Sequence, residues 1–99
     1  MRKKLSDLEI QRALATLPGW TRRADSLTRT FQMRTFVDAI KLVNSVADEA
    51  EKRNHHPDMD IRYSKVTFTL STHDAGGITQ SDLDLGGAIE NLASARSTA

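Results

Sequence analysis

The sequence predicts an α+β domain with the element order α-β-β-α-β-β-α, in which three helices pack on one face of a four-stranded antiparallel sheet. Two kinds of pattern lead to this prediction. Three segments repeat apolar residues at helical spacing, and two pairs of short segments alternate apolar and polar residues around a turn. The chain has 99 residues, and positions 1–99 are expected to form a single domain, because either half alone would be too small to bury a core.

The first helix is expected to begin at Ser6 and to be stopped by Pro18-Gly19. Ser6 and Glu9 match the S-x-x-E capping box, in which each side chain accepts a hydrogen bond from the backbone of the other residue. The apolar face of this helix is expected to carry Ile10, Ala13, Leu14 and Leu17.

Two short strands and a second helix are expected next. The strands cover residues 20–24 and 27–33, with Asp25-Ser26 as the turn. Polar residues of the second strand alternate with apolar ones at Leu27, Phe31 and Met33. Thr35 is expected to cap a helix that runs to about Arg53. Its buried stripe is predicted at Phe36, Ile40, Val43, Ala47 and Ala50.

The second strand pair shows the clearest alternation. Apolar residues occupy every second position, at Met59, Ile61 and Tyr63 and again at Val66, Phe68 and Leu70. Ser64-Lys65 is predicted to form a two-residue turn, which would pair Tyr63 with Val66.

The last helix is expected to begin near Thr79. Its inner face is predicted to carry Leu85, Ile89 and Leu92. Gly86-Gly87 lies within this helix, where each glycine costs about 1 kcal/mol relative to alanine. Close packing against a neighbouring element is the expected reason for these glycines.

The histidines of the chain gather around the open end of the second strand pair. With the predicted register, His56 falls opposite His73, and His55 is its neighbour in the chain. Two carboxylates are close in sequence: Glu51 lies four residues before His55, and Asp82 lies nine residues after His73. The sequence therefore predicts a pocket walled by imidazoles with carboxylates beside them.

Such a pocket suits the removal of water from a carbinolamine. One group must protonate the departing hydroxyl, and another must accept the proton of the adjacent nitrogen. Histidine can serve in both roles because its unperturbed pKa of about 6.5 lies near neutrality. The sequence contains no phosphate-binding loop and no cysteine, and this chemistry needs neither a metal nor a cofactor.

The same residues resemble the signature of the pterin-4a-carbinolamine dehydratases. The matching elements are the segment from Glu51 to His-His-Pro at residues 55–57, an aromatic at Tyr63, the segment Leu70-Ser71-Thr72-His73, and Asp82. One position departs from the pattern, since Met59 stands where many members carry an aromatic residue. The resemblance covers most of the chain and implies the α+β fold described above.

The resemblance also implies an activity and its residues. Members dehydrate a 4a-hydroxytetrahydropterin to the quinonoid dihydropterin and so recycle the pterin cofactor of an aromatic amino acid hydroxylase; they form homodimers or homotetramers. Carried over to this chain, the catalytic and pterin-contacting histidines are His55, His56 and His73, with Asp82 as a further catalytic residue and Glu51 supporting them. The positions that flank the bound pterin are Asn54, Ser71, Thr72 and Asp74.

Other chemical interpretations of these residues stay open. The histidines could form a metal site, although no HExxH pattern is present. Ser71, His73 and Asp82 could form a triad, although no nucleophile elbow surrounds the serine. Asp82 could instead be a capping residue that begins the last helix with Thr79, and Glu51 could belong to a solvated helix end.

The whole domain could also act without catalysis, as a dimerisation or coactivator-type module that binds another protein, or it could use a different pterin such as a molybdopterin-related compound. A formal net charge of +1 gives no reason to expect nucleic acid or a membrane surface as a partner. The absence of cysteine and of a long apolar run favours a cytoplasmic location.

Overall fold

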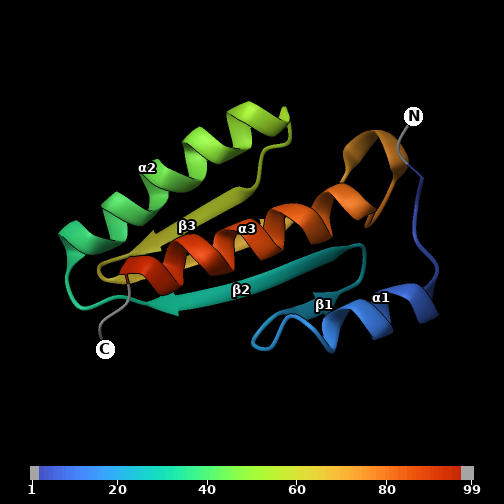
Figure 1. The fold of residues 1–99 in the computed structure, drawn as a ribbon, viewed down its shortest axis with the longest axis horizontal. Coiled ribbons are helices and arrows are strands. Elements are labelled where there is room, and N and C mark those ends of the chain that lie inside the picture. The colour runs from blue at the N-terminus through green and yellow to red at the C-terminus, as the bar shows by residue number, and fades with distance from the viewer. Residues whose placement is uncertain (1–2, 97–99) are drawn as a thin grey trace.

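The computed structural model describes residues 3–96, and it confirms the predicted order of helices and strands (Figure 1). The elements are α1 (Asp7–Leu14), β1 (Thr21–Arg23), β2 (Ser26–Gln32), α2 (Phe36–Arg53), β3 (Asp58–Arg62), β4 (Lys65–Leu70), the short 3-10 helix η1 (His73–Ala75) and α3 (Gln80–Arg96). Across residues 3–96, no helix combines the length and the apolar character that a membrane span requires.

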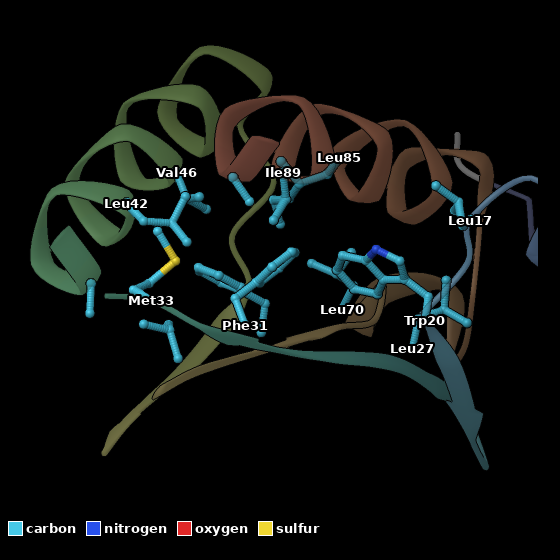
Figure 2. Packing of buried hydrophobic residues seen from close by; sticks show 14 of the residues in the cluster. Leu17, Trp20, Leu27, Phe31, Met33, Leu42, Val46, Leu70, Leu85 and Ile89 are labelled. Atoms are coloured by element: carbon cyan, nitrogen blue, oxygen red, sulfur yellow. The ribbon is translucent and has the colours of Figure 1, made fainter. Parts of the chain in front are cut away.

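The four strands form one antiparallel sheet in the order β1-β2-β4-β3, and the three helices pack on one face of it. The core lies between this face and the helices, as Figure 2 shows for α2 and α3. Phe31 and Phe68 meet edge to face at its centre, with their ring centroids 5.9 Å apart. Leu85 and Ile89 of α3 are fully buried above the sheet, as predicted.

The expected helix caps are present. The Ser6 hydroxyl accepts from the Glu9 backbone N–H at 3.2 Å, and the Glu9 carboxylate accepts from the Ser6 backbone N–H at 2.8 Å. The backbone N–H of Ser6, and then its hydroxyl, lower the pKa of Glu9. Thr35 caps α2 by accepting from the Asp38 backbone N–H at 3.0 Å. These local signals fixed both helix starts correctly.

The end of α1 differs from the prediction, because the helix stops at Leu14 and not at Pro18-Gly19. Beyond Leu14 the chain makes shorter-range turns, in which the Leu17 N–H bonds the Leu14 carbonyl at 3.1 Å. Pro18 has no N–H to donate to the Leu14 carbonyl four residues earlier, so the helical hydrogen bonds cannot continue past that point. Leu17 nevertheless reaches the core.

The buried stripe of α2 was predicted only in part: Ala50 is buried and Val43 packs partly buried against the core, but the other predicted residues do not form the stripe. The stripe that faces the core consists of Ala39, Leu42, Val46 and Ala50. Phe36 is 47% exposed, and the neighbouring Val37 is 57% exposed. The helix has two overlapping apolar faces, and packing against the sheet and α3 selects the one that begins at Ala39. On the other face Val43 still packs partly buried against the core, whereas Phe36 and Ala47 are exposed.

Both hairpin turns lie one residue earlier than predicted. In the second hairpin, Arg62 pairs with Lys65, so that Tyr63-Ser64 forms the turn and Met59 faces Phe68. Ser64 is held there because its carbonyl accepts from the Met33 N–H at 2.8 Å and its hydroxyl lies 2.6 Å from Gln32 Nε2. In the first hairpin the turn is Ala24-Asp25.

Gly19 occupies the left-handed region, with φ +90°, and packs against the side chain of Arg29, which is held in place by its neighbours. The Arg29 guanidinium bonds Glu90 at 2.8 Å and lies 4.4 Å from the centre of the Phe31 ring. Trp20 donates to the same Glu90 oxygen at 2.9 Å. This cluster joins β2 to α3 and leaves no room beside Gly19.

Two glycine-to-alanine substitutions should therefore change stability in opposite directions. In Gly19→Ala the new Cβ would lie 2.6 Å from the Arg29 guanidinium, on a backbone that disfavours side chains. We expect its free energy of unfolding to fall by about 1–3 kcal/mol. Gly87→Ala meets nothing within 4 Å and should gain up to about 1 kcal/mol from helix propensity. Urea unfolding of both variants measures the two free energies of unfolding. A change of the same sign in both variants would contradict the different surroundings described for the two glycines.

Candidate active site

The three histidines converge on one pocket at the end of the sheet where α2 and β4 finish. The pocket has a volume of about 280 Å³ and is lined by Asn54, His55, His56, Ser71, His73 and Asp74. Half of this lining follows α2 and half follows β4. The strand pairing of β3 with β4 ends at Asp58 and Thr69, so His56 and His73 are not cross-strand partners. All three histidines nevertheless line the same pocket.

The end of α2 turns His55 inward. Asn54 caps the helix in the left-handed conformation, with φ 50° and ψ 43°, which asparagine adopts more readily than most residues. Its N–H bonds the last carbonyls of the helix, and the His55 N–H bonds the Ala50 carbonyl at 3.1 Å. His55 is consequently 5% exposed, whereas His56 beside it lies at the surface.

A closed loop presents His73 to the same pocket. The Thr72 N–H donates to the Gly77 carbonyl at 2.9 Å, and the Gly77 N–H donates back to the Thr72 carbonyl at 3.3 Å. Between these residues η1 makes one turn, which Gly76 ends in the left-handed conformation with φ 73°. The pair of hydrogen bonds holds His73 and Asp74 at the surface, on the rim of the pocket.

Asp82 lies beneath the pocket and is completely buried. Its Oδ1 lies 2.5 Å from His55 Nε2. Its Oδ2 accepts from the Thr72 hydroxyl at 2.8 Å and from the Thr79 backbone N–H at 2.9 Å. The last of these contacts is half of a capping box at the start of α3, so Asp82 supports the helix and His55 at once.

Some predicted site residues lie outside the pocket wall. Thr72 is 1% exposed, and its hydroxyl faces Asp82 and Thr79 beneath the pocket. Glu51 is a surface residue whose Oε2 lies 2.5 Å from His56 Nε2. Thr79 was predicted as a helix start and not as part of the site. Its only sequence signal was the T-x-x-D spacing to Asp82, which is also typical of ordinary helix caps.

A larger hollow of about 610 Å³ lies elsewhere, between α1, the end of α2 and α3. It is lined in part by Leu17, Arg53 and Asn91, and it contains no histidine. Arg53 already pairs with Glu49 at 2.8 Å. Although this hollow is larger, it lacks the cluster of histidines that lines the smaller pocket. The smaller pocket is therefore the better candidate. Within residues 3–96, no group of three or more His, Cys, Asp or Glu side chains is arranged to hold a metal ion.

Removal of the buried carboxylate should destabilise the protein. In Asp82→Ala the donors on His55, Thr72 and Thr79 lose their shared acceptor. We expect the free energy of unfolding to fall by about 3 kcal/mol, since each buried unmatched donor costs about 1–3 kcal/mol. Asp84→Ala is the matched control, because Asp84 is exposed and its Oδ1 accepts from Gln80 Nε2 at 2.9 Å within the same helix. Urea unfolding that finds the two variants equally stable would contradict the role given to Asp82.

Comparison with known proteins gives consistent results over nearly the whole chain. A model of the family described as pterin 4 alpha carbinolamine dehydratase matches residues 3–92. A Nocardia farcinica protein is 55% identical over 89 residues, which is 90% of this chain and 94% of the relative. A Roseiflexus protein is 50% identical over 92 residues, which is 93% of this chain and 99% of the relative. Both are named as candidate pterin-4-alpha-carbinolamine dehydratases.

Solved structures show the same fold. A crystal structure from Brucella melitensis, titled as a transcriptional coactivator/pterin dehydratase, has a TM-score of 0.89 and 31% identity and covers 92% of this chain and 99% of its own. A pterin dehydratase-like protein identified as a RuBisCO assembly factor in the alpha-carboxysome has a TM-score of 0.63 and 16% identity, with 80% of this chain and 89% of its own covered. This second likeness concerns the fold alone. The chain belongs to the pterin 4 alpha carbinolamine dehydratase family.

Proposed function

We propose that this protein dehydrates a 4a-hydroxytetrahydropterin to the quinonoid dihydropterin by histidine acid–base catalysis. The observation that carries the proposal is the convergence of His55, His56 and His73 on one pocket of about 280 Å³. The family and its relatives support the reaction class. This volume lies just below the range common for drug-sized ligands, about 300–1,000 Å³, as expected for a pocket that holds a single bicyclic ring.

The reaction needs two proton movements and no redox change. The hydroxyl on C4a accepts a proton from one imidazolium and leaves as water. The electron pair of the N5–H bond forms the C4a=N5 double bond as a neutral imidazole accepts the N5 proton. The three imidazoles supply both roles, and the net change is the loss of one water molecule.

The remaining polar groups have two parts in this proposal. Asn54, Ser71 and Asp74 line the pocket and offer an amide, a hydroxyl and a carboxylate to the polar edge of a pterin. Glu51 holds His56 through the 2.5 Å contact between its Oε2 and Nε2. Thr72 and Asp82 act from beneath, because both are buried.

The proposed setting is the cytoplasm, where the enzyme would recycle the pterin cofactor of an aromatic amino acid hydroxylase. We also propose a homodimer or homotetramer. Phe36 and Val37 leave apolar surface exposed on α2, and Ile61 is 39% exposed on β3, a strand at the edge of the sheet. Either surface could provide a symmetric contact, and light scattering in solution would give the mass of the assembly.

The second candidate function is a non-catalytic module that binds another protein. The exposed apolar residues Phe36 and Val37 of α2 favour it. The Brucella melitensis relative carries coactivator in its title, and the RuBisCO assembly factor has the same fold. A scaffold of this kind has no need for three imidazoles in one pocket, so the enzyme is the better supported proposal.

Histidine substitutions should separate the two functions. With a 4a-hydroxytetrahydropterin as substrate, His55→Ala, His56→Ala and His73→Ala should each lower kcat/KM, and the loss of an acid or base should cost about 10²–10⁴-fold. Asn91→Ala in the larger hollow is the control and should keep the wild-type rate. Stopped-flow absorbance measures the dehydration against the spontaneous reaction.

Two results would contradict the enzyme proposal. One is a folded wild-type protein that does not accelerate the dehydration. The other is a set of histidine variants with unchanged rates. A stoichiometric protein partner that binds through α2, in the absence of turnover, would favour the binding module instead.

A further inference from the structure

A chain of buried hydrogen bonds runs from the start of α3 to His55. The Thr79 and Thr72 hydroxyl oxygens lie 2.8 Å apart, and Thr72 Oγ1 lies 2.8 Å from Asp82 Oδ2. Asp82 Oδ1 then contacts His55 Nε2. Thr72, Thr79 and Asp82 are each at most 1% exposed. No part of the proposed acid–base chemistry uses the two threonine hydroxyls directly.

The donors in this chain point in one direction. A carboxylate only accepts, so the single hydrogen of the Thr72 hydroxyl is donated to Asp82 Oδ2. The Thr79 hydroxyl must then donate to Thr72 Oγ1, whose own hydrogen is already used. The Thr79 backbone N–H supplies a second hydrogen to Oδ2. With two donors on Oδ2, the carboxylate is held with Oδ1 aimed at His55.

The same direction fixes the imidazole. Because Oδ1 accepts, the hydrogen of the 2.5 Å contact sits on Nε2 of His55. A carboxylate partner of this kind selects which ring nitrogen carries the hydrogen and orients the ring. We propose that Thr79 and Thr72 are positioning residues that act through Asp82 to hold His55 with its hydrogen on Nε2.

Thr72 also connects this series of hydrogen bonds to His73. Its backbone N–H and carbonyl make the two hydrogen bonds to Gly77 that close the loop beginning at His73. Thr72 therefore acts on His55 through its side chain and on the neighbouring His73 through its backbone. A change confined to the Thr72 hydroxyl should disturb His55 and leave the closure of the loop intact.

The test uses nearly isosteric substitutions in the full chain. Thr72→Val and Thr79→Val remove one hydroxyl each, and Thr72→Ser and Thr79→Ser restore it. Thr30→Val is the matched control, because Thr30 and Thr67 form a similar hydroxyl pair, 2.7 Å apart, on the exposed face of the sheet. Two measurements are made: long-range ¹H–¹⁵N spectra, which show which ring nitrogen of His55 carries the hydrogen, and the kinetics of dehydration.

We expect Thr72→Val to shift the His55 hydrogen away from Nε2 in part and to lower kcat by about 10–100-fold, by analogy with the loss of outer hydrogen-bond partners behind metal-binding histidines. KM should stay near its wild-type value, because neither threonine lines the pocket. Thr79→Val should have the smaller effect, since Asp82 keeps the Thr72 hydroxyl and the Thr79 N–H. Both serine variants should regain the wild-type spectrum.

Folded valine variants with an unchanged His55 spectrum would overturn the inference. So would a raised KM with an unchanged kcat for Thr72→Val, because that result makes Thr72 a substrate contact. If Thr72→Val does not fold, Thr79→Val decides the question, with Thr79→Ser as its control. The kinetic part rests on the proposed function, but the spectra need no turnover. A protein without dehydratase activity would refute the proposed function and leave the spectra to test the hydrogen-bond chain.

Discussion

The buried carboxylate of Asp82 is the constraint on which the site depends. It joins three segments: the segment that follows α2 through His55, the segment that follows β4 through Thr72, and the start of α3 through its own helix and Thr79. Burial of a carboxylate is costly unless hydrogen bonds compensate for the lost water, and here three donors do so. Separation of any one segment removes a donor from this buried carboxylate, so Asp82 fixes how the three segments meet beneath the pocket.

This arrangement divides the site into a rigid inner part and an accessible outer part. His55 is held from beneath by buried partners, whereas His56 and His73 lie at the surface with Glu51 and Asp74 near them. A ligand would therefore meet one fixed imidazole and two that solvent reaches. Enzymes that move protons benefit from such preorganisation, since a general acid or base must lie within hydrogen-bond reach of the reacting atom.

Local sequence patterns predicted the element order and the caps at Ser6 and Thr35, because these features depend on residues that are close in the chain. The histidine pocket was also predictable in outline, since both arms of the second hairpin end there. The register of the second hairpin was not predictable, because the turn at Tyr63-Ser64 is fixed by hydrogen bonds between Ser64 and the distant Gln32 and Met33. The same limit applies to α2, where two apolar faces compete, and to Thr79, whose hydroxyl partner exists only once β4 and α3 have met.

The most direct test is a titration of the ¹⁵N-labelled protein with 7,8-dihydrobiopterin, with the histidine ring signals and backbone amides observed together. If the three imidazoles surround one pocket, the signals of His55, His56 and His73 should change along one saturation curve. The amides around Asn91, at the larger hollow between α1 and α3, should not move. Changes centred on that hollow, with the three histidines unaffected, would contradict the central claim that these imidazoles surround a single pterin-binding pocket.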